Sequence, residues 1–208
     1  MMRRETLLKI VGLMRKDLGK RMTILEISKK LKIGYRPAYN HINEMEKEGI
    51  IKAEKIGNAR LCSPNLSSAK CRNILGDMDT IKKEELYRKN PKLKAVLESL
   101  ILKLTEKFIS EMHSIVLFGS YAKGTETKKS DIDLLFIVTD IKNKSLREGI
   151  GRESASYEYS HNVKVSPLIT DIAEFRKMLS AKELNIGKEA REYGISLYGS
   201  EMFWRLVA

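Results

Sequence analysis

Two aspartates separated by one residue begin an apolar run in the C-terminal half of the chain. Asp131 and Asp133 belong to the segment 131–138, whose apolar and β-branched residues predict a buried strand. Because side chains alternate along a strand, the two carboxylates should project from the same face, close to each other. Ionised carboxylates so placed need a counter-charge, and Mg²⁺ (or Mn²⁺) is the cation we expect because it prefers oxygen ligands.

A glycine and a serine that follow the preceding apolar run form a candidate phosphate site. Gly119 lets the chain turn closely, and Ser120, eleven residues before Asp131, should begin a short helix. Free amides and a hydroxyl at such a helix start can hold phosphate oxygens. The sequence therefore predicts a phosphate cradle ahead of a carboxylate pair. The loop between them carries three lysines that are more often solvated than bound to phosphate: Lys123, Lys128 and Lys129.

The string LFGSYAKGTETKKSDIDLLFI resembles the signature of the DNA polymerase β-like nucleotidyltransferase superfamily, particularly its minimal nucleotidyltransferases. The resemblance extends to about Gly199 and implies a mixed sheet with flanking helices and a nucleoside triphosphate ligand, with ATP favoured. Minimal members often act as antitoxins that modify a partner, so a protein acceptor is one option. The resemblance also implies catalytic, metal-binding roles for Asp131 and Asp133, and nucleotide-binding roles for Gly119, Ser120, Gly124 and Ser130.

Active members of this superfamily carry a third carboxylate on a later strand, and this sequence departs from that pattern. In the segment HNVKVSPLIT the matching position is Ser166, and no Asp or Glu lies between Glu158 and Asp171. Two hypotheses for this half therefore stay open. One is a Mg²⁺-dependent nucleotidyltransferase that moves a nucleoside monophosphate to an acceptor hydroxyl, and the other is a regulator that senses a nucleotide without catalysis.

The N-terminal third of the chain carries most of its net positive charge. Residues 1–75 hold 17 Lys and Arg against 7 Asp and Glu, a balance of +10, whereas residues 76–208 hold 22 against 20, a balance of +2. Basic side chains that neutralise phosphates release condensed counterions. This asymmetry predicts a polyanion-binding module joined to a nearly neutral one.

Helical signals follow one another in this basic third. Apolar residues at helical spacing predict a first helix over 5–18. Thr23 and Glu26 have the spacing of a capping box that starts a second helix, which runs to about Leu31. Pro37 suits the first position of a third helix, which Gly49 ends. Three short helices in tandem are therefore predicted.

A hairpin is predicted directly after these helices. The segments 50–56 and 59–62 flank Gly57-Asn58, a two-residue turn suited to a tight hairpin. Residues 5–63 thus resemble the winged helix-turn-helix families, which implies binding to double-stranded DNA, or else protein contacts. The third helix would enter the major groove and the wing would touch phosphates, which gives these DNA-binding candidates: Arg36, Tyr39, Asn40, Asn43, Lys47, Lys55 and Arg60.

The remaining segment, 65–112, holds no Gly or Pro cluster long enough for a flexible linker, so we expect a helical connector. A short helix should begin at Asp79, and Asn90-Pro91 should start a long one through Met112. The apolar stripe of the long helix fits packing against the following sheet, or a homodimer seam. The predicted domains are a winged helix-turn-helix over 1–64, a connector over 65–112 and a nucleotidyltransferase domain over 113–208.

The whole chain fits an α+β protein of one large or two small domains with a core of ordinary size. It has 208 residues, 42% hydrophobic and 32% charged, which excludes fibrous, disordered and membrane-spanning classes. Lys9, Arg15 and Lys16 interrupt any secretory signal, so we expect a cytoplasmic location and no membrane partner. Cys62 and Cys71 match no zinc or redox spacing and should be reduced. DNA binding beside a nucleotide site suggests a role in transcription regulation.

Overall fold

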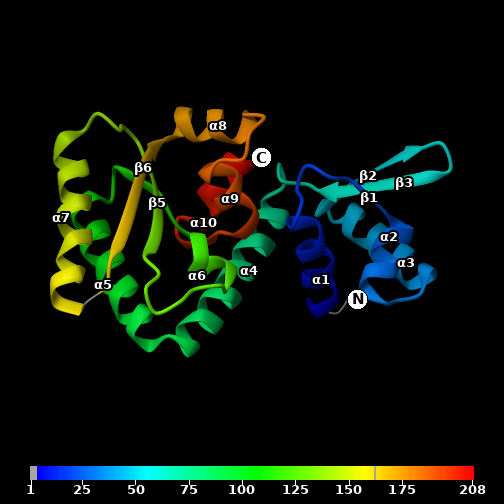
Figure 1. Ribbon diagram of the computed structural model, residues 1–208. Helices are drawn as coiled ribbons and strands as arrows, with labels where there is room; N and C mark the ends of the chain where they lie inside the picture. The colour runs from blue at the N-terminus through cyan, green and yellow to red at the C-terminus, as the bar shows by residue number, and fades with distance from the viewer. Residues whose placement is uncertain (1–3, 162) are drawn as a thin grey trace. The chain divides into compact units, whose positions relative to one another are not determined.

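The computed structural model describes residues 4–161 and 163–208. The chain divides into two compact units, one that ends at Met78 and one that spans Asp79–Val207. Helix α4 (Ala69–Lys89) runs from the first unit into the second (Figure 1). The finer division at residues 64 and 112 stays a prediction. No helix in the described part of the chain is long and apolar enough to cross a bilayer.

The N-terminal unit contains the predicted helices and hairpin. Strands β2 and β3 pair in antiparallel fashion, and Ile56 lies opposite Ala59 across the Gly57-Asn58 turn. A two-residue strand, too short to be evident in the sequence, adds to the sheet in the order β1-β3-β2. Three helices and a wing are therefore confirmed. The bounds are α1 (Arg4–Arg15), β1 (Met22–Thr23), α2 (Ile24–Leu31), α3 (Tyr35–Lys47), β2 (Ile51–Ile56) and β3 (Ala59–Pro64).

Local capping explains where α2 begins. The backbone N–H of Glu26 donates to Thr23 Oγ1 at 3.1 Å, and the backbone N–H of Thr23 donates to the Glu26 carboxylate at 2.7 Å. The predicted capping box is thus confirmed. Helix α3 begins at Tyr35, so the prediction that Pro37 takes its first position was wrong by two residues. Cys62 and Cys71 are buried free thiols, as expected, and burial raises the pKa of each to about 11.

The C-terminal unit is built on a mixed four-stranded sheet in the order β6-β5-β4-β7. Strand β6 is parallel to β5, while β4 is antiparallel to both β5 and β7. This confirms the α+β class. The bounds are α5 (Pro91–Phe108), β4 (Met112–Phe118), α6 (Gly119–Lys123), β5 (Ile132–Val138), α7 (Lys144–His161), β6 (Val165–Asp171), α8 (Ile172–Ser180), α9 (Ile186–Tyr193), β7 (Ile195–Tyr198) and α10 (Ser200–Val207).

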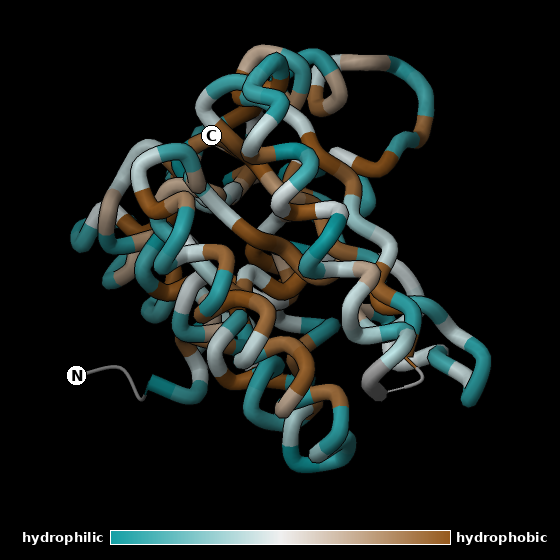
Figure 2. The backbone as a smooth tube through the Cα atoms, turned by 90° about the vertical axis from the view of Figure 1, so that its left-hand side faces the viewer, coloured by the Kyte–Doolittle hydropathy of each residue, from teal (hydrophilic) through white to brown (hydrophobic). Residues whose placement is uncertain are grey.

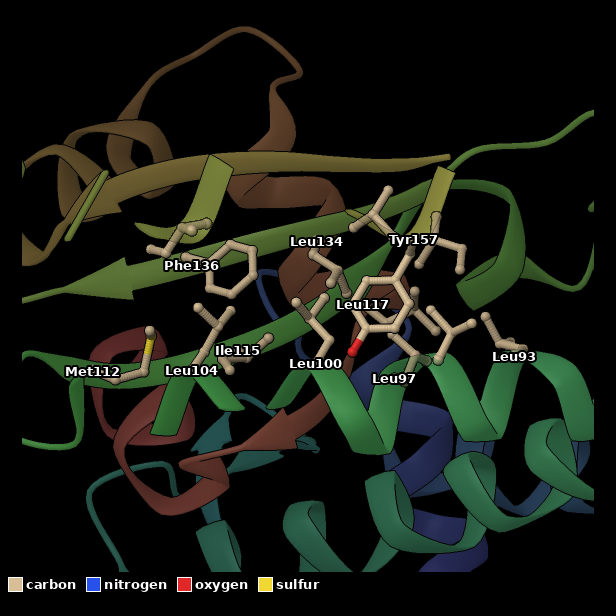
Figure 3. Close-up of a cluster of buried hydrophobic side chains, with 14 of the residues drawn as sticks. Leu93, Leu97, Leu100, Leu104, Met112, Ile115, Leu117, Leu134, Phe136 and Tyr157 are labelled. Atoms are coloured by element: carbon tan, nitrogen blue, oxygen red, sulfur yellow. The ribbon is translucent and has the colours of Figure 1, made fainter. Parts of the chain in front are cut away.

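Helices cover both faces of this sheet. Helices α5 and α7 lie on one face, and α8, α9 and α10 contact the other (Figure 1). In Figure 2 the inner stretches of the chain are mostly brown, whereas the outer turns are mostly teal. Figure 3 shows the stripe of α5 pointing toward the sheet, with Leu97, Leu100 and Leu104 facing Ile115, Leu117, Leu134 and Phe136.

The packing of α5 decides between the two uses predicted for its apolar stripe. Leu97, Leu100 and Leu104 are fully buried within one chain. Each such leucine contributes roughly 1.5–3 kcal/mol through removal from water, and none of that surface is left for a second copy. The core-packing prediction is confirmed for these leucines, whereas Ile109 at the end of the same stripe is 68% exposed and the homodimer stays a prediction.

Several predicted helix ends were wrong. Helix α4 begins at Ala69 rather than Asp79, and α5 ends at Phe108 because β4 already starts at Met112. Asn90 is the N-cap of α5, but its side chain donates back to the Leu86 carbonyl rather than capping the helix. Helix propensity is a weak signal at such junctions, and at the end of α5 the long-range pairing of β4 with β5 and β7 overrides it.

Candidate functional site

One end of the sheet gathers the residues that the sequence singled out. Asp133 pairs with Phe118 of β4 on one side and with Ser166 of β6 on the other. Gly119 follows Phe118 directly, so the Gly-Ser turn lies beside Asp133. Ile132 and Leu134 belong to the core under α5 and α7, which places Asp131 and Asp133 on the opposite face.

Gly119 allows a very close approach of the turn to Asp133. Its φ is +69°, and a Cβ atom added there would lie 2.1 Å from Asp133 Oδ2. No side chain can occupy that space, and φ in this region favours glycine. The position therefore needs glycine for two independent reasons, which are its positive φ and the nearness of the Asp133 carboxylate.

The two carboxylates have different surroundings. Lys164 Nζ lies 2.5 Å from Asp131 Oδ2, and Ser166 Oγ donates to the same oxygen at 3.1 Å. The bond from Lys164 holds the pKa of Asp131 below its usual value. Burial raises the pKa of Asp133, and the negative charges of Asp131 and Glu189 raise it further. Asp131 is thus a paired carboxylate, and Asp133 is a partly desolvated one.

Lys164 and Glu189 are the residues of this site that sequence reasoning did not assign a role. Strand alternation places Lys164 on the face of Ser166, but gives no reason to pair it with Asp131. Glu189 comes from α9 and forms an ion pair of 2.7 Å with Lys123 of α6. No signal in the sequence connects it to Asp133, because only packing brings α9 to α6.

A polar pocket of about 220 Å³ lies next to Asp131 and Lys164. Lys128, Lys129 and Glu158 are among its lining residues. Glu158, eight residues before Ser166, therefore lies near the site. Glu174, eight residues after Ser166, lies in the first turn of α8 beyond the far end of β6, where its backbone N–H donates to the carboxylate of the N-cap residue Asp171.

The remaining phosphate-site candidates have local structural contacts. Ser130 Oγ accepts a hydrogen bond from the Thr127 backbone N–H at 2.9 Å, in the turn that leads to Asp131. Gly124 ends α6 with φ +70°, and its backbone N–H points to the Ser120 carbonyl. These contacts shape the loop between the turn and the carboxylates. Phosphate binding by Ser120, Gly124 and Ser130 stays a prediction.

The donor set suits one divalent ion better than two. No group of three His, Cys, Asp or Glu side chains in the described part of the chain could hold a metal. Asp131 and Asp133 supply carboxylate oxygens on one face, and a nucleotide would add phosphate oxygens, which is sufficient for a Mg²⁺ that keeps several waters. Ser166 adds no charge, so a second ion would lack a carboxylate of its own.

The candidate DNA-binding residues divide into two groups. Arg60 forms an ion pair with Glu46 and a hydrogen bond with Asn43, and its guanidinium lies 5.8 Å from the centre of the Tyr39 ring. Arg60 and Asn43 therefore join the wing to α3, and their contact with DNA stays a prediction. The other candidates are exposed: Arg36, Tyr39, Asn40, Lys47 and Lys55.

Comparison with known proteins agrees with this geometry. The family described as "Nucleotidyltransferase domain" matches residues 97–193, and the family described as "Winged helix-turn-helix DNA-binding" matches residues 3–52. A protein of Methanocaldococcus jannaschii named "Putative protein adenylyltransferase MJ1305" is 31% identical over 117 residues, which is 54% of this chain and 76% of the relative. The chain belongs to the nucleotidyltransferase family. Its N-terminal part is a winged helix-turn-helix, as the resemblance predicted.

Two further relatives are also named as protein adenylyltransferases, and a solved structure aligns with part of the chain. A second M. jannaschii protein named in the same way, MJ0141, is 26% identical over 87 residues, 42% of this chain and 80% of the relative. "Protein adenylyltransferase MntA" of Shewanella oneidensis is 36% identical over 59 residues, 28% of this chain and 42% of that protein. A crystal structure of a toxin-antitoxin with AMP-PNP aligns at 20% identity with a TM-score of 0.35, over 52% of this chain and 81% of that one.

Proposed function

We propose that the C-terminal unit transfers a nucleoside monophosphate from a nucleoside triphosphate to an acceptor hydroxyl, with Mg²⁺ or Mn²⁺. The acceptor oxygen bonds to the α-phosphorus, and the bond from that phosphorus to the bridging oxygen of the β-phosphate breaks. Pyrophosphate leaves, and the acceptor proton passes to water. A bound divalent ion would neutralise part of the charge of the triphosphate and would lower the pKa of an acceptor hydroxyl.

The close contact between Gly119 and Asp133 carries this proposal. It brings a turn that can accept phosphate oxygens to a carboxylate that can hold the ion bound to those phosphates. Asp131 stands on the same face and completes the pair. In this arrangement Asp131 and Asp133 hold the metal, while Gly119, Ser120, Gly124 and Ser130 orient the phosphates.

We propose ATP as the nucleotide and a protein side chain as the acceptor. The support is the family of relatives, because MJ1305, MJ0141 and MntA are all named as protein adenylyltransferases. A tyrosine, serine or threonine hydroxyl would serve as the attacking oxygen. This would make the chain a modifier of a partner protein, in the manner of an antitoxin.

The winged helix would direct this activity to double-stranded DNA. The charge balance of +10 in residues 1–75 supports this, as do the exposed Arg36, Asn40 and Lys55 of α3 and the wing. A protein that binds both an operator and a nucleotide would suit transcription regulation. We place it in the cytoplasm.

One observation favours a second function, a nucleotide sensor without turnover. Lys164 and Ser166 both contact Asp131 at the place where active superfamily members are expected to carry a further carboxylate. A site with one paired aspartate can still bind Mg²⁺ and a triphosphate. It would then report nucleotide binding to the DNA-binding unit without forming a product.

Incubation of the full chain with ATP labelled at the α-phosphate tests both functions. The transferase should release pyrophosphate and place label on itself or on proteins of a cell extract, and EDTA should abolish both. Asp131→Asn and Asp133→Asn should abolish them too, whereas Asp140→Asn, beyond the other end of β5, should not. Binding of ATP without any label transfer would favour the sensor. Binding that needs neither the aspartates nor a divalent ion would contradict both functions.

A further inference from the structure

Lys164 holds a positive charge directly against one of the two carboxylates. Its backbone carbonyl accepts a hydrogen bond from the Ile132 N–H at 2.8 Å, which places the residue beside the start of β5. From there the ammonium reaches Asp131 Oδ2 at 2.5 Å, and Ser166 Oγ donates to that same oxygen. Oδ2 thus has two donors, and a metal would have to displace both to bind it.

Asp133 stands in contrast to this paired carboxylate. None of the described residues donates a hydrogen bond to it or forms an ion pair with it. The lysine of α6, Lys123, is held by Glu189 at 2.7 Å and lies over the Tyr193 ring. Asp133 and the second oxygen of Asp131 are therefore the carboxylate oxygens that remain for a cation.

We propose that Lys164 serves as a built-in cation in place of a second divalent ion, so that this site loads one divalent ion with its nucleotide. This inference rests on the proposed nucleotide function. The two aspartates carry two negative charges, and Lys164 cancels one of them. A second divalent ion near Asp131 Oδ2 would meet the repulsion of the ammonium, and Ser166, opposite Asp133 on β6, supplies no carboxylate to offset it.

Among the described residues, Lys164 forms an ion pair with Asp131 and with no other charged group. Glu158 lines the same pocket and is exposed, and Lys128 and Lys129 line it without an ion pair among the described residues. Lys128 therefore provides a matched control. It has the same side chain, lines the same pocket, and forms no hydrogen bond or ion pair with Asp131 among the described residues.

Binding of Mn²⁺ to the full chain tests the proposal without any turnover. Free Mn²⁺ is measured by electron paramagnetic resonance, first with the ion alone and then with α,β-methylene-ATP, which cannot be cleaved at the α-phosphate. The variants are Lys164→Met, which keeps an apolar stem of similar length, and Lys128→Met. Lys164 is 57% exposed in its side chain, so the variant should fold, and circular dichroism checks this. Lys164→Gln is the second variant.

Wild type should bind one Mn²⁺ per chain with the analogue. Lys164→Met should bind Mn²⁺ alone about tenfold more tightly or better, because a repelling charge is lost and Asp131 Oδ2 becomes free. Lys128→Met should change this affinity by less than about twofold. Two ions of similar affinity in wild type, or an unchanged affinity in Lys164→Met, would overturn the role of Lys164 and leave the transferase proposal standing. No Mn²⁺ bound even with the analogue would overturn both.

Discussion

Gly119→Ala is the sharpest test of whether the Gly-Ser turn and Asp133 form one site. An alanine Cβ would lie 2.1 Å from Asp133 Oδ2, whereas ordinary van der Waals contact begins at 3.4 Å. The carboxylate must therefore move by roughly 1 Å or more, or the turn must shift instead. A displacement of that size in a catalytic group can reduce a rate by about 100-fold.

The same substitution also strains the backbone. The φ of +69° at Gly119 lies in the left-handed region, where a residue with a Cβ atom costs about 1–2 kcal/mol. For a chain of this size that amounts to a fall of roughly 2–8 °C in melting temperature. We therefore expect a modest loss of stability together with a large loss of function.

Two measurements separate these effects. Affinity for Mn²⁺ with α,β-methylene-ATP should fall at least about tenfold in Gly119→Ala, and label transfer from ATP should fall by about 100-fold. Gly57→Ala is the control, because Gly57 has φ +56° and nothing within 4 Å of its Cβ position. It should show comparable strain and unchanged nucleotide affinity. Gly119→Ala with wild-type affinity and transfer would refute the reasoning.

Three further outcomes are expected. Asn40→Ala should reduce discrimination among duplexes by about 1–3 kcal/mol. Lys55→Ala should instead weaken binding to all duplexes and lower the slope of log affinity against log salt concentration by roughly one, as fluorescence anisotropy would show. Equal effects of Asn40→Ala on every sequence would count against base reading by Asn40. Ser166→Asp should raise Mn²⁺ affinity, and product formation only in this variant would identify a weakened transferase. Thr23→Ala should destabilise the N-terminal unit by about 1 kcal/mol at neutral pH. The backbone N–H of Thr23, and then its hydroxyl, lower the pKa of Glu26, so the stabilisation by these bonds is present at neutral pH and is lost as the pH falls through that lowered pKa. Thr23→Ala removes only the bond from the hydroxyl, so the loss should be smaller at acid pH. A loss that is the same in urea titrations at neutral and acid pH would contradict this.

Features that depend on neighbours in the chain could be predicted from the sequence. The capping box of Thr23 and Glu26 acts across three residues, and the Gly57-Asn58 turn sets its own hairpin. Alternation along β5 places Asp131 and Asp133 on one face, because successive side chains of any strand point to opposite sides. These signals depend on backbone geometry within one or two turns or one strand.

Features that depend on strand pairing and helix packing could not be predicted in this way. The contact of Lys164 with Asp131 joins residues 33 positions apart, and it forms because β6 returns parallel to β5 after α7. Glu189 reaches the neighbourhood of Asp133 because α9 packs against α6, and the closeness of Gly119 to Asp133 follows from the register of β4 on β5. Register and packing are selected by burial of the whole sheet between two layers of helices. No local period or spacing encodes that choice, so the sequence indicates which groups could do chemistry, and the tertiary structure decides which of them meet.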